Sequence, residues 1–229
     1  MGAFTNWIVL GALCSTIVLT VSGSVSAESV EGSVRGDAPT KAISNSGSAS
    51  YYWKVWNGAL PEQPAKDDHS DLLAVLTGAF TGPPIGCTFS FRGGGLEPST
   101  VAARAGTPIR IENLDAFTHE LVVRGLPGFT PLESGPGKAR VVPVPAGGPW
   151  EVGDRLYGHI DGYLHSMREL VACATVTPNG GFRFDGVPPG PYSLRVLRGP
   201  EQVAIRRVTV AAGRTLQVDP LTLSSSGEK

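Results

Sequence analysis

Short β-prone runs separated by glycine and proline are the feature that most restricts how this chain can fold. The chain has 229 residues, and its 30 glycines and 19 prolines lie between apolar runs. From residue 28 onward, no stretch of about 12 or more residues has the 3.6-residue apolar period of an amphipathic helix. Many tight turns between short strands are typical of β-sandwiches and barrels. We therefore predict an all-β chain after the N-terminal segment.

The first 27 residues have the pattern of a secretory signal peptide. An apolar run of roughly 15 residues is shorter than the roughly 20 that a spanning helix needs. The small residues of Val25-Ser26-Ala27 suit cleavage by a signal peptidase, although no Lys or Arg precedes the apolar run. We expect export to the periplasm or the medium. Attachment to a membrane is expected only if the leader stays uncleaved.

Charge and motif content exclude several classes of function. The formal net charge is -1, and neither a basic patch nor interleaved aromatic residues indicate a nucleic-acid partner. The sequence has no Gly-x-Ser-x-Gly elbow and no His-Glu-x-x-His helix. A phosphate-binding loop is also absent, because the run at 93–95 lacks the Lys-Ser/Thr that follows in such loops. We therefore do not expect an enzyme.

Two cysteines remain when the leader is removed, Cys87 and Cys173. In an oxidising compartment they can pair as a disulfide. The alternative is two buried free thiols, since Cys is commonly buried. The count excludes a Cys-rich scaffold and a zinc ribbon.

A stretch in the middle of the chain resembles a cupredoxin-like domain. A β-prone run ends in Asn113-Leu-Asp115, and His119 follows shortly after. Further on, His165-Ser-Met167 lies in a segment that reads as an irregular loop. The resemblance implies a Greek-key sandwich with copper held by His119, His165 and the axial thioether of Met167.

The chain departs from the cupredoxin pattern at the thiolate ligand. The position about three residues before His165 is Gly162, and no Cys occurs between residues 88 and 172. The copper–thiolate bond gives blue sites their redox role, so rapid electron transfer is not expected. His159 is the candidate replacement for the thiolate in a non-blue site. The alternative is a retained fold without metal.

Other residues near His119 have structural interpretations as well. Asp115 and Glu120 flank the histidine and are candidates to orient its imidazole. Asp115 is more simply explained as a turn residue. In the metal-free alternative, His119 begins a strand and hydrogen-bonds a loop, while Met167 belongs to the core.

The C-terminal part resembles carboxypeptidase-regulatory-like, transthyretin-type β modules. The carrying motif is Gly-Phe-Arg-Phe-Asp-Gly-Val-Pro-Pro-Gly-Pro-Tyr, which ends at Tyr192. Alternating aromatic residues enter a core, and Pro-Pro-Gly reverses the chain. The resemblance implies a small β-sandwich and no reaction, because such modules are generally accessory.

These patterns divide the chain into a leader at 1–27 and four further parts. We expect a flexible segment at 28–50, a cupredoxin-like sandwich at 51–170, a transthyretin-like module at 171–223 and a frayed tail at 224–229. An alternating run at 29–35 also predicts a strand that fits either sandwich. The segment 51–56 is rich in aromatic residues and reads as a strand, and the apolar run at 72–77 reads as a buried strand.

Two functions remain open from the sequence. The first is an exported copper-binding protein that holds or delivers the ion through His119, His165, Met167 and His159. The second is a metal-free module that binds a protein or glycan at the cell envelope. In the second case Trp53 and Trp56 are candidates for exposed contacts.

Overall fold

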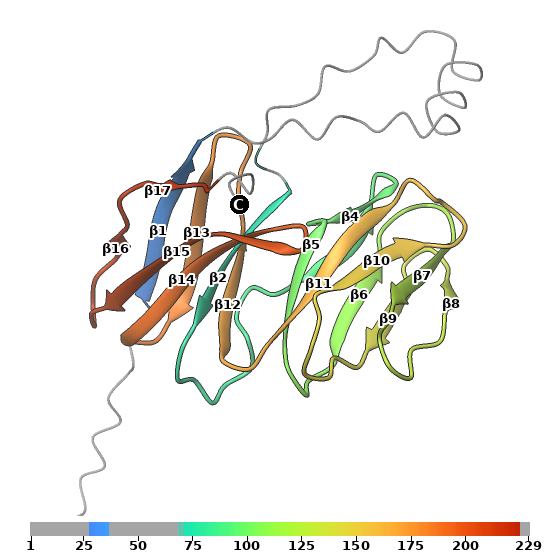
Figure 1. The fold of residues 1–229 in the computed structure, drawn as a ribbon, viewed down its shortest axis with the longest axis horizontal. Coiled ribbons are helices and arrows are strands. Elements are labelled where there is room, and N and C mark those ends of the chain that lie inside the picture. Colours follow the sequence, from blue (N-terminus) through green and yellow to red (C-terminus); the bar gives the residue numbers. More distant parts are fainter. Residues whose placement is uncertain (1–27, 37–68, 70, 225–229) are drawn as a thin grey trace, which may run out of the picture.

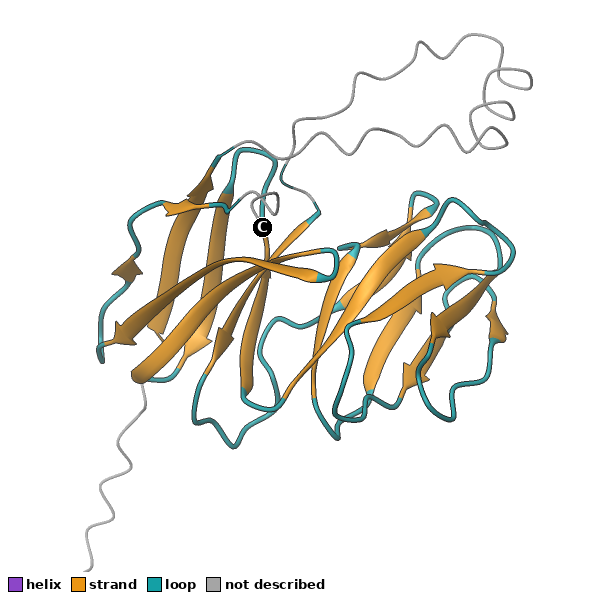
Figure 2. Ribbon diagram, in the orientation of Figure 1, coloured by secondary structure: helices purple, strands orange, loops and turns teal. Residues whose placement is uncertain are grey.

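The computed structural model describes residues 28–36, 69 and 71–224, and every regular element in them is a β-strand (Figures 1 and 2). The prediction of an all-β chain is thereby confirmed for these residues. No helix in them is long and apolar enough to cross a membrane. The leader at 1–27, the aromatic run at 51–56 and the tail beyond residue 224 lie outside the described residues.

One sandwich, here called the terminal sandwich, is built from the first two and the last six strands. One sheet has the order β13-β1-β16, with β17 also paired to β1, and the other has the order β12-β2-β14-β15. The strands are β1 (Glu28–Arg35), β2 (Leu72–Thr77), β12 (Leu170–Thr175), β13 (Gly181–Val187), β14 (Gly190–Arg198), β15 (Glu201–Val210), β16 (Leu216–Gln217) and β17 (Leu221–Thr222).

The other nine strands form the inserted sandwich, which leaves the terminal sandwich after β2 and returns at β12 (Figure 1). Its sheets have the orders β5-β11-β10-β7-β8 and β4-β3-β6-β9. The strands are β3 (Phe89–Arg92), β4 (Gly95–Glu97), β5 (Thr100–Arg104), β6 (Ile109–Asn113), β7 (His119–Arg124), β8 (Leu132–Ser134), β9 (Ala139–Val142), β10 (Trp150–Asp154) and β11 (Asp161–Met167).

The strand pairing changes how two early segments are assigned. Residues 28–35, expected within a flexible segment, form β1 and pair antiparallel with β13. The run at 72–77, expected inside the unit at 51–170, pairs with β12 and β14. Both strands therefore belong to the terminal sandwich. The backbone hydrogen bonds of a strand need a neighbour of matching register, and here the matching neighbours lie about 100 residues or more further along the chain.

Strand β2 is buried on both faces, which explains its continuous apolar sequence. Leu72 and Leu76 face the core of the terminal sandwich. Leu73 and Val75 face the core of the inserted sandwich. A strand covered on both sides lacks the alternation of a half-exposed strand. The sequence-based expectation of a buried strand is confirmed here.

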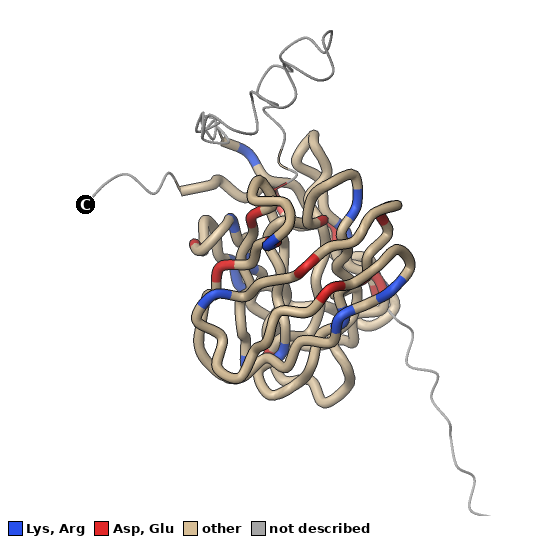
Figure 3. The backbone as a smooth tube through the Cα atoms, turned by 90° about the vertical axis from the view of Figure 1, so that its right-hand side faces the viewer, with Lys and Arg blue, Asp and Glu red and all other residues tan. Residues whose placement is uncertain are grey.

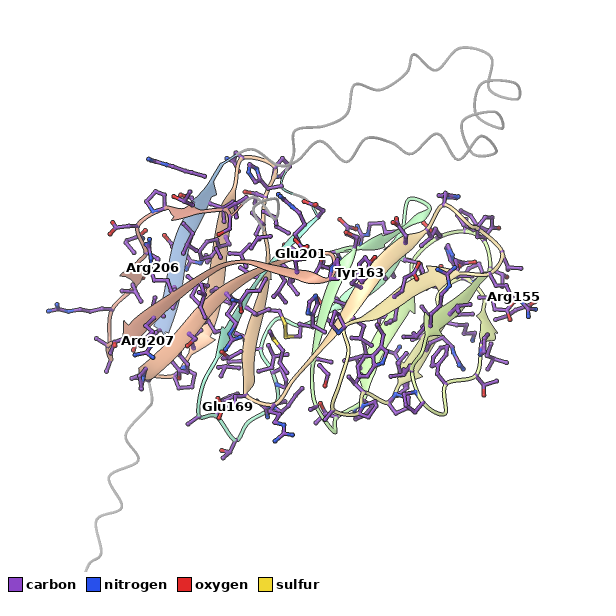
Figure 4. All side chains as sticks on the ribbon, in the orientation of Figure 1. Arg155, Tyr163, Glu169, Glu201, Arg206 and Arg207 are labelled. Atoms are coloured by element: carbon purple, nitrogen blue, oxygen red, sulfur yellow. A yellow bond between two sulfur atoms is a disulfide. The ribbon has the colours of Figure 1, made fainter. Side chains whose placement is uncertain are left out.

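Hydrogen bonds fasten the two sandwiches along this shared layer. Thr100 Oγ1 donates to the Asp71 carbonyl at 2.8 Å and accepts from the Gly199 amide at 3.0 Å. Arg104 donates to the Leu170 carbonyl and to the Gly82 carbonyl. Figure 4 shows the labelled Tyr163 and Glu201 at this junction. The β14–β15 hairpin thus reaches the inserted sandwich through its turn.

A disulfide also joins the two parts. Cys87, just before β3, is bonded to Cys173 in β12, with 4.9 Å between their Cα atoms. The bond is the yellow link near the centre of Figure 4. Of the two alternatives that the sequence left open, the structure has the disulfide.

Positive and negative residues are mixed along the backbone on one side of the molecule. Figure 3 shows positive and negative residues interspersed on the face it draws, and the formal net charge is -1. Such a surface gives no support to a polyanionic partner.

Candidate functional site

His119 is the first residue of β7 and is completely buried. Its Nδ1 lies 2.7 Å from Asp154 Oδ2, and its Nε2 lies 2.9 Å from Asp115 Oδ2. Both contacts are hydrogen bonds when both ring nitrogens carry hydrogen, because an ionised carboxylate only accepts. We call this arrangement the Asp–His–Asp clamp.

Asp115 is positioned by the turn that follows β6. Its backbone amide bonds Asn113 Oδ1 at 2.9 Å, and its carboxylate accepts from the amides of Gly93 and Gly94. Burial alone raises the pKa of Asp115. The hydrogen bonds from Gly94, His119 and Gly93, with the charge of His119, outweigh burial and hold the pKa below its usual value. Asp115 is therefore both a turn residue and an orienter of His119, as the sequence suggested.

Asp154 closes the clamp from the end of β10, and its side chain is completely buried. Besides His119 it accepts from the amide of Glu120 at 3.2 Å. Its other oxygen accepts from the amides of Leu156 and Tyr157 at 2.7 and 3.0 Å. Asp154 was not among the residues predicted from the sequence. The sequence does contain a hint of this role. An Asp at the end of a β-prone run often accepts hydrogen bonds from the backbone amides of the turn that follows.

Aromatic rings enclose the clamp. Phe91 stacks on His119 with 4.3 Å between ring centroids and 8° between planes. The ring centroids of Phe117 and Tyr157 lie 4.9 and 5.4 Å from the centroid of the His119 ring. Glu120, the other candidate orienter, instead faces Arg155 Nε at 2.9 Å.

The other predicted ligands lie elsewhere. His165 belongs to β11, which the sequence analysis had read as a loop, and its Nε2 donates to the Gly199 carbonyl at 2.7 Å. Gly153, next to Asp154, pairs with Asp161, so His165 lies four residues further along β11. That step is about 13 Å at roughly 3.3 Å per residue. Donors for one ion must lie within about 4 Å of each other.

His159 lies beside the clamp, with its ring centroid 6.3 Å from that of Tyr157, but its contact is with a backbone carbonyl and not with His119. His159 is exposed and donates from Nε2 to the Gly94 carbonyl at 3.0 Å. Met167 packs against the core of the inserted sandwich, as the metal-free interpretation expected. In the part of the chain that the structure describes, no three His, Cys, Asp or Glu side chains form a group that could hold a metal.

The residues therefore do not fit a copper ion. Both nitrogens of His119 are engaged, and the two carboxylates face opposite edges of the ring, so they do not converge on one point. The place of the missing thiolate is filled as well. A Cβ on Gly162 would lie 2.9 Å from Leu96 Cδ2 and closer still to the Ser99 carbonyl oxygen.

Gly162→Ala tests this close approach. We expect the free energy of unfolding to fall by about 1–3 kcal/mol, because the added methyl meets backbone rather than a flexible side chain. Urea unfolding followed by tryptophan fluorescence measures the change. Gly158→Ala is the matched control, since nothing lies within 4 Å of its Cβ position. Equal stability of the two variants would contradict the packing described for Gly162.

The junction histidine predicts a pH dependence. Burial lowers the pKa of His165, and the hydrogen bond to the Gly199 carbonyl only partly offsets the shift. The unfolded chain therefore binds a proton at higher pH than the folded chain. Stability from this group is present above about pH 6.5 and is lost as pH falls, by up to about 1.4 kcal/mol per pH unit. Urea unfolding at pH 8, 6 and 5 should show a steeper loss for the native chain than for His165→Gln. Parallel curves would contradict this assignment.

Comparisons with known proteins give similarity in solved structures only. No family model matches the chain, and no curated protein matches it. A copper-containing nitrite reductase from Thermus scotoductus SA-01 is 20% identical with a TM-score of 0.33, over 39% of this chain and 24% of that chain. Amicyanin from Paracoccus versutus is 12% identical with a TM-score of 0.33, over 40% of this chain and 97% of that one. An oxidised amicyanin mutant is 15% identical with a TM-score of 0.32, over 36% of this chain and 82% of that one. This chain thus spans less than two thirds of the nitrite reductase.

At these TM-scores the similarity assigns neither a ligand nor a partner.

Proposed function

We propose that this chain is a metal-free, non-enzymatic module of the cell envelope that binds a partner protein at the end of the inserted sandwich. The observation that carries the proposal is the engagement of both His119 nitrogens by Asp115 and Asp154. A histidine that donates from both nitrogens holds the two loops together and has no lone pair to offer a metal. The interpretation as a copper-binding protein is the alternative that the test below must exclude.

The loops fixed by the clamp carry exposed apolar side chains. Leu114, Phe117 and Leu156 are 46%, 39% and 47% exposed. Phe117 also contacts the half-buried Tyr157, with 5.0 Å between ring centroids. We call these four residues the loop-end surface. The two loops that carry these side chains are joined by the clamp and lie at one end of the inserted sandwich. Large exposed apolar side chains concentrated in one region indicate an interaction site.

The clamp links the two loops that form this surface. Asp115 follows Leu114 directly, and His119 comes two residues after Phe117. Asp154 binds the amides of Leu156 and Tyr157. Breaking the clamp therefore frees both loops together. A surface held in place before binding loses less conformational entropy when its partner arrives.

The chemistry of the loop-end surface favours a protein over a glycan. Sugar hydroxyls need free hydrogen-bonding groups beside an aromatic ring. Here the neighbouring polar groups of Asp115, His119 and Asp154 are buried and bonded to one another. Two exposed leucines suit an apolar protein surface, and the exposed Arg155 supplies the polar rim typical of an interface (Figure 4).

A placement in the envelope is supported by two features. The disulfide of Cys87 and Cys173 suits an oxidising compartment. The leader-like segment at 1–27 suits export, although it lies outside the described residues.

Site-specific photocrosslinking in the native envelope tests the proposal. With p-benzoylphenylalanine in place of Phe117, we expect one discrete adduct that disappears when Leu156→Ser is added. The same crosslinker in place of Ile205, which is 55% exposed on β15 of the other sandwich, is the control and should not give that adduct. Equal adducts at both positions, or one copper ion per purified chain, would reject the proposal.

A further inference from the structure

The edge of β13 is free in the described chain. β13 pairs only with β1 on one side, so its other side has no strand neighbour there. Across the opening of the terminal sandwich lies β12, whose outer edge carries only a single bridge between Ile85 and Ala172. Alternate residues of an antiparallel strand turn their N–H and C=O groups away from the paired neighbour. At Gly181 these groups are bonded to Thr177, so the outer edge of β13 offers backbone donors and acceptors for another strand from Arg183 onward.

This edge borders a groove of about 830 Å³. Residues 181–185 of β13 line one side, and residues 172–175 of β12 line the other. Thr88, Phe89 and Pro98 of the connection and the inserted sandwich also line it. Five residues of β13 correspond to about 17 Å of extended chain. The volume is within the usual range for a ligand site of roughly 300–1,000 Å³.

The side chains along β13 specify what the groove accepts. Phe182 and Phe184 point into the core, whereas Arg183 and Asp185 are exposed on the outer face. Arg183 already forms ion pairs with Asp185, at 2.7 Å, and with Glu31 of β1. A strand added in register places one side chain opposite Arg183 and another opposite Asp185, so that each new charge joins this exposed group. Opposite charges directly across a pair of strands stabilise the pairing, and like charges weaken it.

We propose that this groove binds an extended peptide segment of a partner protein by antiparallel addition to the free edge of β13. The segment has a carboxylate opposite Arg183, an ammonium group opposite Asp185 and small β-branched residues between and beside them. This is strand addition, in which backbone hydrogen bonds give affinity and alternate side chains give specificity. The site is separate from the loop-end surface, so either proposal can fail without the other.

A second copy of this chain is a poorer occupant. The groove has walls from both sandwiches, since Pro98 and Phe89 line it together with residues of β12 and β13. A second sandwich is too wide to enter between these walls and pair its edge strand with β13. A single extended chain is narrow enough to lie in the groove. Light scattering decides this point. A dimer that is lost in Arg183→Glu would overturn the proposal in favour of self-association.

The binding test uses a synthetic peptide and the full mature chain. The probe is acetyl-Thr-Lys-Val-Glu-Val-Thr-amide, titrated into 15N-labelled protein. In antiparallel register its Glu lies opposite Arg183 and its Lys opposite Asp185. We expect amide shift changes confined to 172–175 and 181–185. Changes spread over the surface, no change at millimolar peptide, or equal binding of a peptide whose Lys and Glu backbone nitrogens are methylated would overturn the proposal.

Charge exchange sharpens the test. A peptide with Lys in both charged positions should bind the native chain about three- to tenfold more weakly than the probe. It should bind Arg183→Glu more tightly than it binds the native chain, because both positions of the variant strand are then acidic. Arg124→Glu, in an exposed ion pair of the inserted sandwich, is the matched control. This variant should bind the peptide with two Lys as weakly as the native chain does. If Arg183→Glu unfolds, Asp185→Lys with a peptide carrying two Glu tests the same pairing. If the affinity for the exchanged peptide is the same in the variant as in the native chain, the proposed register is refuted.

Discussion

Replacing Asp154 with alanine should lower the free energy of unfolding by about 3–5 kcal/mol. The fully buried carboxylate accepts from His119 Nδ1 and from the amides of Glu120, Leu156 and Tyr157. Removing it leaves a buried imidazole N–H and three backbone N–H groups without their acceptor. Unsatisfied buried donors are costly, and a buried charge that loses its partner is more so.

Urea unfolding of the two proteins at neutral pH measures this loss. Glu112→Ala is the matched control, because it removes an exposed carboxylate whose ion pair with Arg110 should contribute at most about 1 kcal/mol. Amide exchange should also become faster at residues 155–158 in Asp154→Ala than in the control. A loss below about 1 kcal/mol for Asp154→Ala would contradict the clamp as the element that holds these loops.

Loss of the disulfide should have an effect of similar size. The bond between Cys87 and Cys173 spans 86 positions of the chain. Opening a loop of that size restores unfolded-state entropy equivalent to about 4–5 kcal/mol. Because Cys87 precedes the inserted sandwich and Cys173 follows it, the bond fastens the base of the insertion.

Two preparations measure that effect independently. The Cys87→Ala/Cys173→Ala protein and the native chain in excess dithiothreitol should both unfold at lower urea concentration than the oxidised chain. The two preparations should agree with each other within about 1 kcal/mol, since both lack the same cross-link. Titration of two free thiols in the purified native chain, before any reductant is added, would contradict the bond itself.

The local elements of the fold could be predicted from the sequence. The absence of a helical period predicted an all-β chain, and the apolar run of β2 predicted a buried strand. The partner of β2 could not be predicted, because β12 begins 93 positions after the end of β2 and local patterns carry no information about such pairing. For the same reason β1 looked like the start of either sandwich.

The candidate site was predictable to a similar extent. His119 and Asp115 lie four positions apart, and their proximity was visible in the sequence. Asp154 lies 35 positions from His119 and reaches it only through the pairing of β7 with β10. His165 and Met167 were expected as ligands because the segment resembles the ligand loop of a cupredoxin. Within a strand they extend along β11, away from the clamp.

The state of the His119 ring is the most direct test of the account. A long-range 1H–15N correlation spectrum of the histidine rings, recorded with and without one equivalent of Cu(I), reports the state of both nitrogens. The Asp–His–Asp clamp predicts that Nδ1 and Nε2 of His119 both carry hydrogen and that neither signal moves when copper is added. An unprotonated nitrogen on His119 whose signal shifts with copper, together with a shift of His165, would contradict the clamp and favour a metal site.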